Sequence, residues 1–203
     1  DTAALSLSAA DVQVLGGGRL ITPSIVTVQG VTLTLSGALI GASAVNLGSA
    51  SAFLVNSGCS HNLTNLTASS TSTTSLQNGV ALVLSGRLQL NSGALLTLSG
   101  QNTLNATEIA LLAGSSVTGT GTGYAAATGP GAGSSNDGAA HGGCSSQLAC
   151  AVGGTSVPRS YNSFASPTLP GSGGGVGSAA GGAGGASLRI ATSRTLVLNG
   201  SIS

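Results

Sequence analysis

The most constraining feature of this sequence is a succession of short segments in which apolar and polar residues alternate. Residues 31–35 read Val-Thr-Leu-Thr-Leu, whereas a further predicted strand at residues 80–84, Val-Ala-Leu-Val-Leu, is apolar throughout. Because successive side chains of a β-strand point to opposite faces, this period of two predicts strands with one buried face. Further strands are predicted at 13–15, 25–28, 44–47, 52–55, 88–90, 95–98, 108–112, 188–191 and 195–198. A helical period is missing from the sequence, so we expect almost no helix.

The endings of these strands recur and indicate how the strands connect. Leu-Ser-Gly closes three of them, at 35–37, 84–86 and 98–100, which predicts similar corners. The strands are too short and too numerous for simple hairpins, and only Asn78-Gly79 offers a hairpin turn before a convincing strand. Small and aliphatic residues suit a narrow interior, and aromatic residues are few. The predicted fold class is all-β, a parallel β-helix (solenoid) of short strands with a long glycine-rich insertion.

A change of composition divides the chain into three parts. The segment 114–187 contains 21 of the 34 glycines and four of the five prolines. We therefore predict solenoid coils over 1–113, a glycine-rich insertion over 114–187, and returning strands over 188–203. Apolar residues of the insertion indicate order rather than a flexible linker, packed on the solenoid or on a neighbouring subunit: Tyr124, Leu148, Val152, Val157, Tyr161, Phe164 and Leu169.

Charge excludes several classes of function. The chain has five arginines, no lysine, four acidic residues and a net charge of +1, so it lacks the basic cluster that nucleic-acid binding requires. It has no apolar run of about 18 residues, so no membrane span is predicted. Solubility must depend on hydroxyl and amide groups and, we expect, on glycans. The absence of methionine and the start at Asp1 indicate a processed, secreted product.

Four Asn-x-Ser/Thr sequons fit export, and their asparagines are Asn62, Asn65, Asn105 and Asn199. We predict N-glycosylation at these positions. The cysteines agree with an oxidising compartment. Cys144 and Cys150 flank five residues and are predicted to form a small disulfide loop, whereas Cys59 is either a free buried thiol or an intermolecular partner.

Catalytic and metal-binding patterns are missing. The acids are Asp1, Asp11, Glu108 and Asp137, and no two have a spacing that would bring a carboxylate pair together. Cys59-Ser60-His61 lacks the paired ligand spacing of a zinc centre, and His141 is isolated. We therefore expect no enzymatic activity, no metal site and no cofactor.

The C-terminal part carries a recognisable pattern. A glycine-rich run at 171–175 precedes Gly-Gly-Ala-Gly-Gly-Ala-Ser-Leu-Arg-Ile at 181–190 and Arg-Thr-Leu-Val-Leu-Asn-Gly-Ser-Ile at 194–202, with His-Gly-Gly at 141–143. This pattern resembles the glycine-rich β-helix modules of large secreted and cell-surface structural proteins of protists and bacteria, with tubular mastigoneme fibres as one setting. The resemblance covers roughly 114–203. It implies a β-helix in an extracellular or cell-surface protein without enzymatic activity, although the cysteine-flanked insertion departs from it.

These observations predict an extracellular, glycosylated structural protein that self-associates into a homopolymer, as a filament or a surface layer. The alternative is a secreted adhesin or an ice- or glycan-binding solenoid module, because outward threonines such as Thr32 and Thr34 could present a lattice of hydroxyl groups. The same threonines are also ordinary strand residues.

Overall fold

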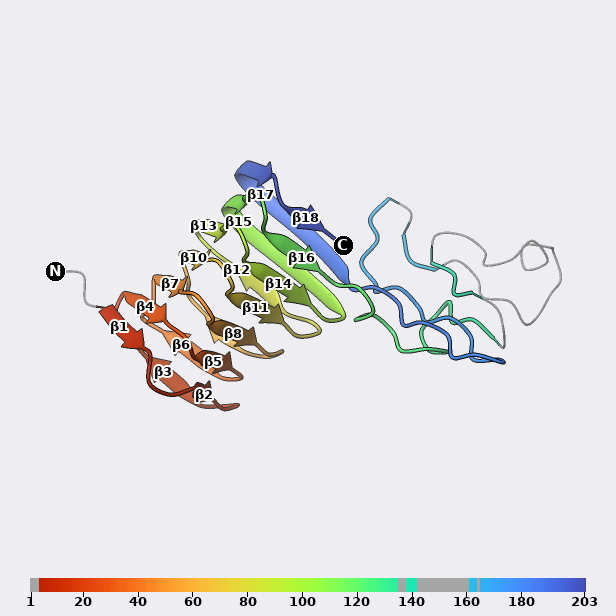
Figure 1. Cartoon of the computed structure of the whole chain (residues 1–203), viewed down its shortest axis with the longest axis horizontal. Coiled ribbons are helices and arrows are strands. Elements are labelled where there is room, and N and C mark those ends of the chain that lie inside the picture. Colours follow the sequence, from red (N-terminus) through yellow and green to blue (C-terminus); the bar gives the residue numbers. More distant parts are fainter. Residues whose placement is uncertain (1–3, 135–137, 142–160, 164) are drawn as a thin grey trace. The chain divides into compact units, whose positions relative to one another are not determined.

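The structure is a computed structural model that describes residues 4–134, 138–141, 161–163 and 165–203 (Figure 1). Within these residues the protein is all-β and contains no helix. The chain divides into two compact units. The solenoid unit comprises residues 1–97, 102–118 and 189–203, and the glycine-rich unit comprises residues 98–101 and 119–188.

The described strands lie in three parallel sheets. The eight-stranded sheet contains β1 (Ala4–Leu7), β4 (Ile25–Val28), β7 (Ala44–Leu47), β10 (Asn65–Ala68), β13 (Arg87–Leu90), β15 (Gln101–Leu111), β12 (Ala81–Val83) and β17 (Ser187–Leu198). The seven-stranded sheet contains β2 (Val12–Val14), β5 (Thr32–Leu35), β8 (Ala52–Val55), β11 (Thr73–Leu76), β14 (Leu95–Leu98), β16 (Ser116–Thr118) and β18 (Ser201–Ile202). The three-stranded sheet contains β3 (Arg19–Ile21), β6 (Ala38–Ile40) and β9 (Ser60–His61).

The register of these sheets makes the unit a solenoid. Ala4, Ile25, Ala44 and Asn65 are successive partners in the eight-stranded sheet, so one coil takes 21, 19 and then 21 residues. Each strand therefore pairs with its equivalent one coil later, which a meander of hairpins would not do. The predicted fold class, a parallel β-solenoid, is confirmed.

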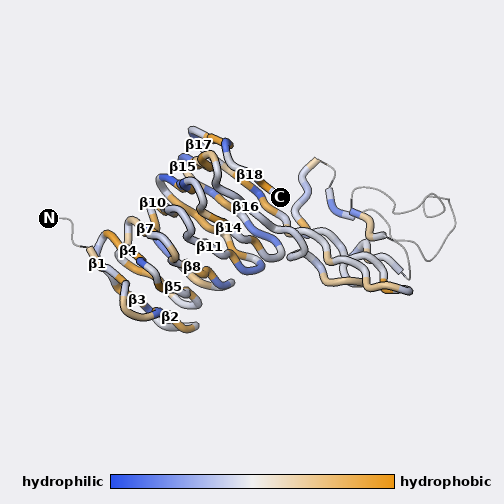
Figure 2. Tube along the Cα trace, in the orientation of Figure 1, coloured by the Kyte–Doolittle hydropathy of each residue, from blue (hydrophilic) through white to orange (hydrophobic). Residues whose placement is uncertain are grey.

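The core follows from the alternation in the sequence. Most of the four-residue strands have alternately half-exposed and buried side chains, and Figure 2 shows apolar and polar residues alternating along the coils. The buried residues stack in columns of aliphatic side chains, as Val26 and Val45 do. Phe53, the largest fully buried side chain, lies between Leu33 and Thr74. The interior is narrow, so small and aliphatic residues fill it.

One turn recurs at the corner that leads into the seven-stranded sheet. In residues 48–51, 69–72, 91–94 and 112–115, the fourth backbone N–H donates to the first carbonyl oxygen at 3.4, 3.1, 2.9 and 2.9 Å. The third residue has a positive φ in each, and it is Ala50, Thr71, Gly93 or Gly114. Where the fourth residue is serine, its hydroxyl donates to the same carbonyl.

The structure contains several strands that the sequence pattern does not predict. The individual strands predicted from the sequence do not include β1, β3, β6, β9, β10, β11 and β16. The two strands predicted at 188–191 and 195–198 are one strand, β17, and the returning segment 188–203 also contains β18. β16 lies in the solenoid, although the sequence placed the insertion from residue 114 onward. The three Leu-Ser-Gly endings also differ from expectation, because Gly100 has a positive φ whereas Gly37 and Gly86 do not. Their corners are therefore not alike.

The long excursion occupies a single coil of the solenoid. Ser116 pairs with Ser201, 85 residues later, where other coils take about 20. The chain leaves after β16 and returns as β17, which pairs with β15. The solenoid register thus continues across the insertion.

Hydrogen bonds between glycine backbones organise the glycine-rich unit. Gly184 N–H donates to Tyr124 O at 2.9 Å, Gly171 N–H to Gly185 O at 2.9 Å, and Gly174 N–H to Gly182 O at 2.9 Å. A Cβ atom on Gly184 would collide with the carbonyl oxygen of Gly171, so the close approach requires glycine. Of the apolar residues predicted to anchor the segment, Leu148, Val152, Val157 and Phe164 lie outside the described residues.

Candidate functional site

A column of hydroxyl side chains follows the corner that leads into the eight-stranded sheet. Ser43 Oγ donates to Ser24 O at 2.8 Å, Ser85 Oγ to Thr64 Oγ1 at 3.2 Å, and Thr107 Oγ1 to Ser85 O at 2.7 Å. These hydrogen bonds connect successive coils. Thr64 and Thr107, the third residues of two sequons, therefore have a structural role as well.

The asparagines of those two sequons share one outward column. Asn62 and Asn105 are exposed. Val83 pairs with Asn105, and the hydrogen bond from Ser85 N–H to Leu63 O places Val83 opposite Asn62 on its other side. Since neighbouring strands lie about 4.8 Å apart, the two asparagines are separated by about 10 Å. Glycans on both would flank Val83, an apolar side chain that is 50% exposed.

The other two sequon asparagines lie in different places. Asn65 is on β10, where its Oδ1 accepts a hydrogen bond from Arg87 N–H at 2.9 Å. This carbonyl is therefore used between coils, while the amide nitrogen that would carry a glycan has no part in that bond. Asn199 is exposed in the turn between β17 and β18, and its N–H donates to Leu111 O at 2.8 Å.

Of the three cysteines, the structure describes Cys59. Cys59 is a half-buried free thiol, and burial raises its pKa above the ordinary value of 9.0. A thiol that stays protonated is a weak nucleophile. Cys144 and Cys150 lie outside the described residues, so their disulfide remains a prediction.

The acidic residues that the structure describes are Asp11 and Glu108, while Asp1 and Asp137 lie outside it. Asp11 Oδ1 accepts a hydrogen bond from Thr32 N–H at 2.6 Å, which ties the first two coils together. Glu108 is half-buried on β15, where it pairs with Arg87 of the neighbouring strand β13. Several coils of the solenoid separate it from Asp11. Asp11 precedes β2 of the seven-stranded sheet whereas Glu108 belongs to the eight-stranded sheet, so these two carboxylates do not form a pair.

The two histidines belong to different units. His61 pairs with Leu39, and its Nδ1 is buried without a hydrogen-bond partner among the described residues. Burial lowers the pKa of His61 below 6.5. His141 belongs to the glycine-rich unit, where its ring contacts the Tyr161 ring edge-on at 4.6 Å. Among the described residues, no three His, Cys, Asp or Glu side chains could hold a metal ion, and no helix could cross a membrane.

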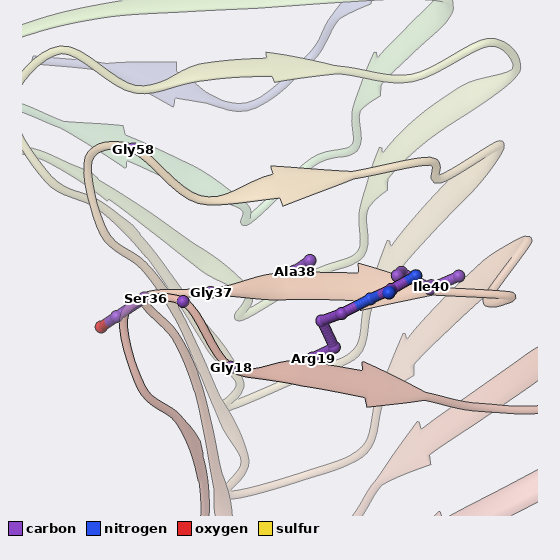
Figure 3. A pocket seen from close by; sticks show the side chains of 8 residues that line it. Gly18, Arg19, Ser36, Gly37, Ala38, Ile40 and Gly58 are labelled. Atoms are coloured by element: carbon purple, nitrogen blue, oxygen red, sulfur yellow. The ribbon is translucent and has the colours of Figure 1, made fainter.

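A shallow groove of about 380 Å³ lies beside the first coils (Figure 3). Its walls are mostly glycine and other small residues, and its one charged side chain is Arg19, which extends from β3 toward Ile40. The lining consists of Gly17, Gly18, Arg19, Ser36, Gly37, Ala38, Ile40 and Gly58. It includes neither an acid nor a histidine, so a general acid or base is missing from the groove.

The end coils of the solenoid carry most of its exposed large apolar side chains, with Val83 on an inner coil as the exception among the described residues. Ile21 is 73% exposed and Leu15 is 63% exposed in the first coil. In the last coil Ile202 is 50% exposed, and Leu196 and Leu198 are nearly as exposed. The strands there also have open edges, since β2 pairs with β5 alone and β18 with β16 alone within the described part of the chain. Both ends therefore combine exposed apolar side chains with unpaired strand edges, beside the exposed Arg19 on β3 and Arg189 and Arg194 on β17.

A functional interpretation must rest on this geometry, because comparisons with known proteins give no match. No protein-family model, no curated protein and no solved structure matches the chain.

Proposed function

We propose that the protein is an extracellular structural protein whose solenoids stack end to end, giving a glycosylated filament or surface layer. The observation that carries the proposal is the pair of end coils, which combine exposed apolar side chains with unpaired strand edges. Soluble β-proteins normally protect such edges with charge, proline or a covering segment. Here Asp11, just before β2, is bonded to Thr32 N–H, and the exposed charges on the end strands are arginines, Arg19 on β3 and Arg189 and Arg194 on β17. The apolar side chains on the same coils stay exposed.

The direction of the strands favours a head-to-tail contact, in which the last coil of one copy meets the first coil of the next. Every strand runs parallel to its neighbour, so the last coil of one copy offers β17 and β18 in the orientation that β1, β3 and β2 of the next copy require. Such a contact uses two different surfaces of the same molecule. It does not close, and repetition gives a filament.

The free energy of the end-to-end contact indicates which interactions stabilise it. Covering each half-exposed aliphatic side chain contributes about 1 kcal/mol, and the end coils carry Leu15, Ile21, Leu196, Leu198 and Ile202. Association costs at least about 4 kcal/mol in lost translational and rotational freedom. The apolar side chains alone only offset this cost, so backbone hydrogen bonds between the open edges must supply the net affinity.

The sequons support an extracellular location and a coated outside. Asn62, Asn65 and Asn105 lie on inner coils, where glycans leave both ends open. Glycans there would supply the hydration that the sparse charges do not. Intact mass before and after enzymatic deglycosylation of the secreted protein measures their presence, and an unmodified product contradicts this part of the proposal.

The stacking is tested with single substitutions at the two ends. Ile21→Lys and Ile202→Lys each place a charge on an open edge and should convert filaments into monomers, as seen by electron microscopy and sedimentation. Val83→Lys is the matched control, because Val83 is 50% exposed but lies on an inner coil. A wild-type protein that stays monomeric at high concentration, or a Val83→Lys variant that loses assembly equally, contradicts the proposal.

A further inference from the structure

The outward side of the seven-stranded sheet carries two columns of short side chains. Alternate residues of its strands point away from the core, and strand pairing aligns them from coil to coil. One column is Thr32, Ala52, Thr73, Leu95, Ser116 and Ser201, and the other is Thr34, Leu54, Ser75, Thr97, Thr118 and Ser203. Figure 1 shows β5, β8, β11, β14 and β16 following one another in this order.

The chemistry of this surface differs from that of the other outward faces. From β5 to β18 it has no charged and no aromatic residue, and nine of the twelve side chains are Ser or Thr. The outward face of the eight-stranded sheet instead carries Arg87 and Glu108, and that of the three-stranded sheet carries Arg19. A neutral lattice of hydroxyl and methyl groups is thus confined to one sheet.

Hydrogen bonds between neighbouring coils fix the hydroxyl groups of the lattice. Thr97 Oγ1 donates to Ser75 Oγ at 2.7 Å, Ser201 Oγ to Ser116 Oγ at 3.0 Å, and Ser203 Oγ to Thr118 Oγ1 at 3.2 Å. A side chain that is already held in place loses little conformational entropy when it binds. The lattice is therefore preorganised.

We propose that this face binds ice. Its groups repeat about every 4.8 Å across the strands and about every 6.6 Å along them, which are the spacings of adjacent strands and of alternate residues. Such a rectangular repeat is close to that of water on the prism faces of ice. Methyl groups of Thr and the side chains of Ala52, Leu54 and Leu95 restrict the orientation of nearby water, and the hydroxyl groups join that ordered layer by hydrogen bonds.

Two observations favour ice over a soluble ligand or a polysaccharide. The side chains are too short to enclose a small molecule, and sites for small molecules are concave. Binding of sugar rings commonly uses the flat faces of aromatic side chains, and Phe53, the aromatic residue of this sheet, points into the core. An extended, neutral crystalline surface is the ligand that fits.

The sequons leave this face open. Asn62, Asn65 and Asn105 belong to other faces, and Asn199 lies in the turn before β18. The proposal does not depend on end-to-end stacking, because a single solenoid already presents the two columns.

The test is thermal hysteresis and ice-crystal shape with the full-length chain. We expect wild-type protein to shape ice and to give hysteresis, and Thr73→Arg and Thr97→Arg to abolish both. Thr67→Arg is the matched control, because Thr67 is equally half-buried but points outward from the eight-stranded sheet. It should keep the wild-type activity, and equal melting temperatures of the three variants show that folding is preserved.

Three outcomes overturn the proposal. The wild-type protein has no effect on ice growth, or Thr67→Arg loses activity together with Thr73→Arg, or the wild type binds crystalline chitin or cellulose while ice growth is unaffected. Thr97→Arg removes the hydrogen bond from Thr97 Oγ1 to Ser75 Oγ, whereas Thr73 is a half-buried outward residue, so Thr73→Arg remains informative if Thr97→Arg does not fold.

Discussion

Thr71 Oγ1 accepts a hydrogen bond from the backbone N–H of Ala50 at 3.0 Å, and both residues have a positive φ, of 60° and 58°. They occupy the same position of the recurrent turn in successive coils, where Gly93 and Gly114 follow in the next two. A side chain in this left-handed conformation costs about 1 kcal/mol. Two corners therefore hold a strained residue, and the hydrogen bond offsets part of that cost.

Ala50→Gly should stabilise the protein by up to about 1 kcal/mol, because glycine adopts a positive φ without strain. Ala50 is exposed, so the change leaves the core intact. Ala44→Gly is the control, since Ala44 lies in β7 with an extended backbone and its replacement should destabilise by about 0.5 to 1 kcal/mol. Chemical denaturation compares the two, and equal destabilisation would contradict the assignment of strain to Ala50.

Thr74 presents a second local conflict. It is fully buried beside Phe53, and its Oγ1 has no hydrogen-bond partner within the described residues. Burying an unpaired hydroxyl costs about 1 to 3 kcal/mol, so Thr74→Val, which keeps the shape, should raise stability by about 1 kcal/mol. Thr73→Val, one residue away and pointing outward, should change it little. A loss of stability in Thr74→Val would indicate that the hydroxyl is satisfied in the native state.

Buried threonines such as Thr74 also explain which strands can be predicted from the sequence and which cannot. Clear alternation in Val31–Leu35 and Ile25–Val28 predicts the fold class, because few folds bury so many short one-sided strands. β11, Thr73–Leu76, was missed because its inward residues are Thr74 and Leu76, and a buried threonine looks polar in a sequence. Stacking on Phe53 and the strand pairing supply the energy that the local pattern lacks.

The candidate surfaces were harder to predict than the fold. Coils vary from 19 to 22 residues, so a fixed period does not align them. Thr73 and Ser75 therefore continue the columns of Thr32 and Thr34 only when the register is known. For the same reason, the sequence gives no sign that Asn62 and Asn105 lie in one column around Val83.

Acid should weaken the solenoid through His61. Its pKa is lowered by burial in the folded state but stays near 6.5 in the unfolded chain, so the unfolded state binds the proton first. The contribution of His61 to stability should be constant above about pH 7 and fall as the pH drops below 6.5. His61→Leu, which extends the apolar column of Leu20 and Leu39, should remove this dependence.

Denaturation midpoints at pH 7.5 and pH 5 measure the effect of His61. His141→Gln is the control for the other histidine, which belongs to the glycine-rich unit. If His61→Leu keeps the full loss of stability at pH 5, the buried imidazole is not its cause.

The glycine-rich unit should be sensitive to single methyl groups at defined positions. A Cβ atom on Gly184 would collide with the backbone of Gly171, whereas one on Gly182 has open space. Gly184→Ala should therefore destabilise the unit by about 2 kcal/mol, which is the scale of overpacking, and Gly182→Ala should not. Limited proteolysis of residues 119–188 measures local opening, and equal cleavage of the two variants would argue against the packed glycine backbones.

A glycan on Asn199 should interfere with assembly more than a glycan on the other sequons, since Asn199 lies in the last coil between β17 and β18. A glycan there extends into the space that the next copy must occupy, while glycans on Asn62 and Asn105 stay on the side of inner coils. Asn199→Gln should therefore lengthen filaments of the secreted, glycosylated protein, and Asn62→Gln should not. Enzymatic removal of all glycans should give the same lengthening. Filaments that shorten or stay unchanged in Asn199→Gln, with occupancy of the wild-type site established by mass spectrometry, would place the growing end elsewhere on the solenoid.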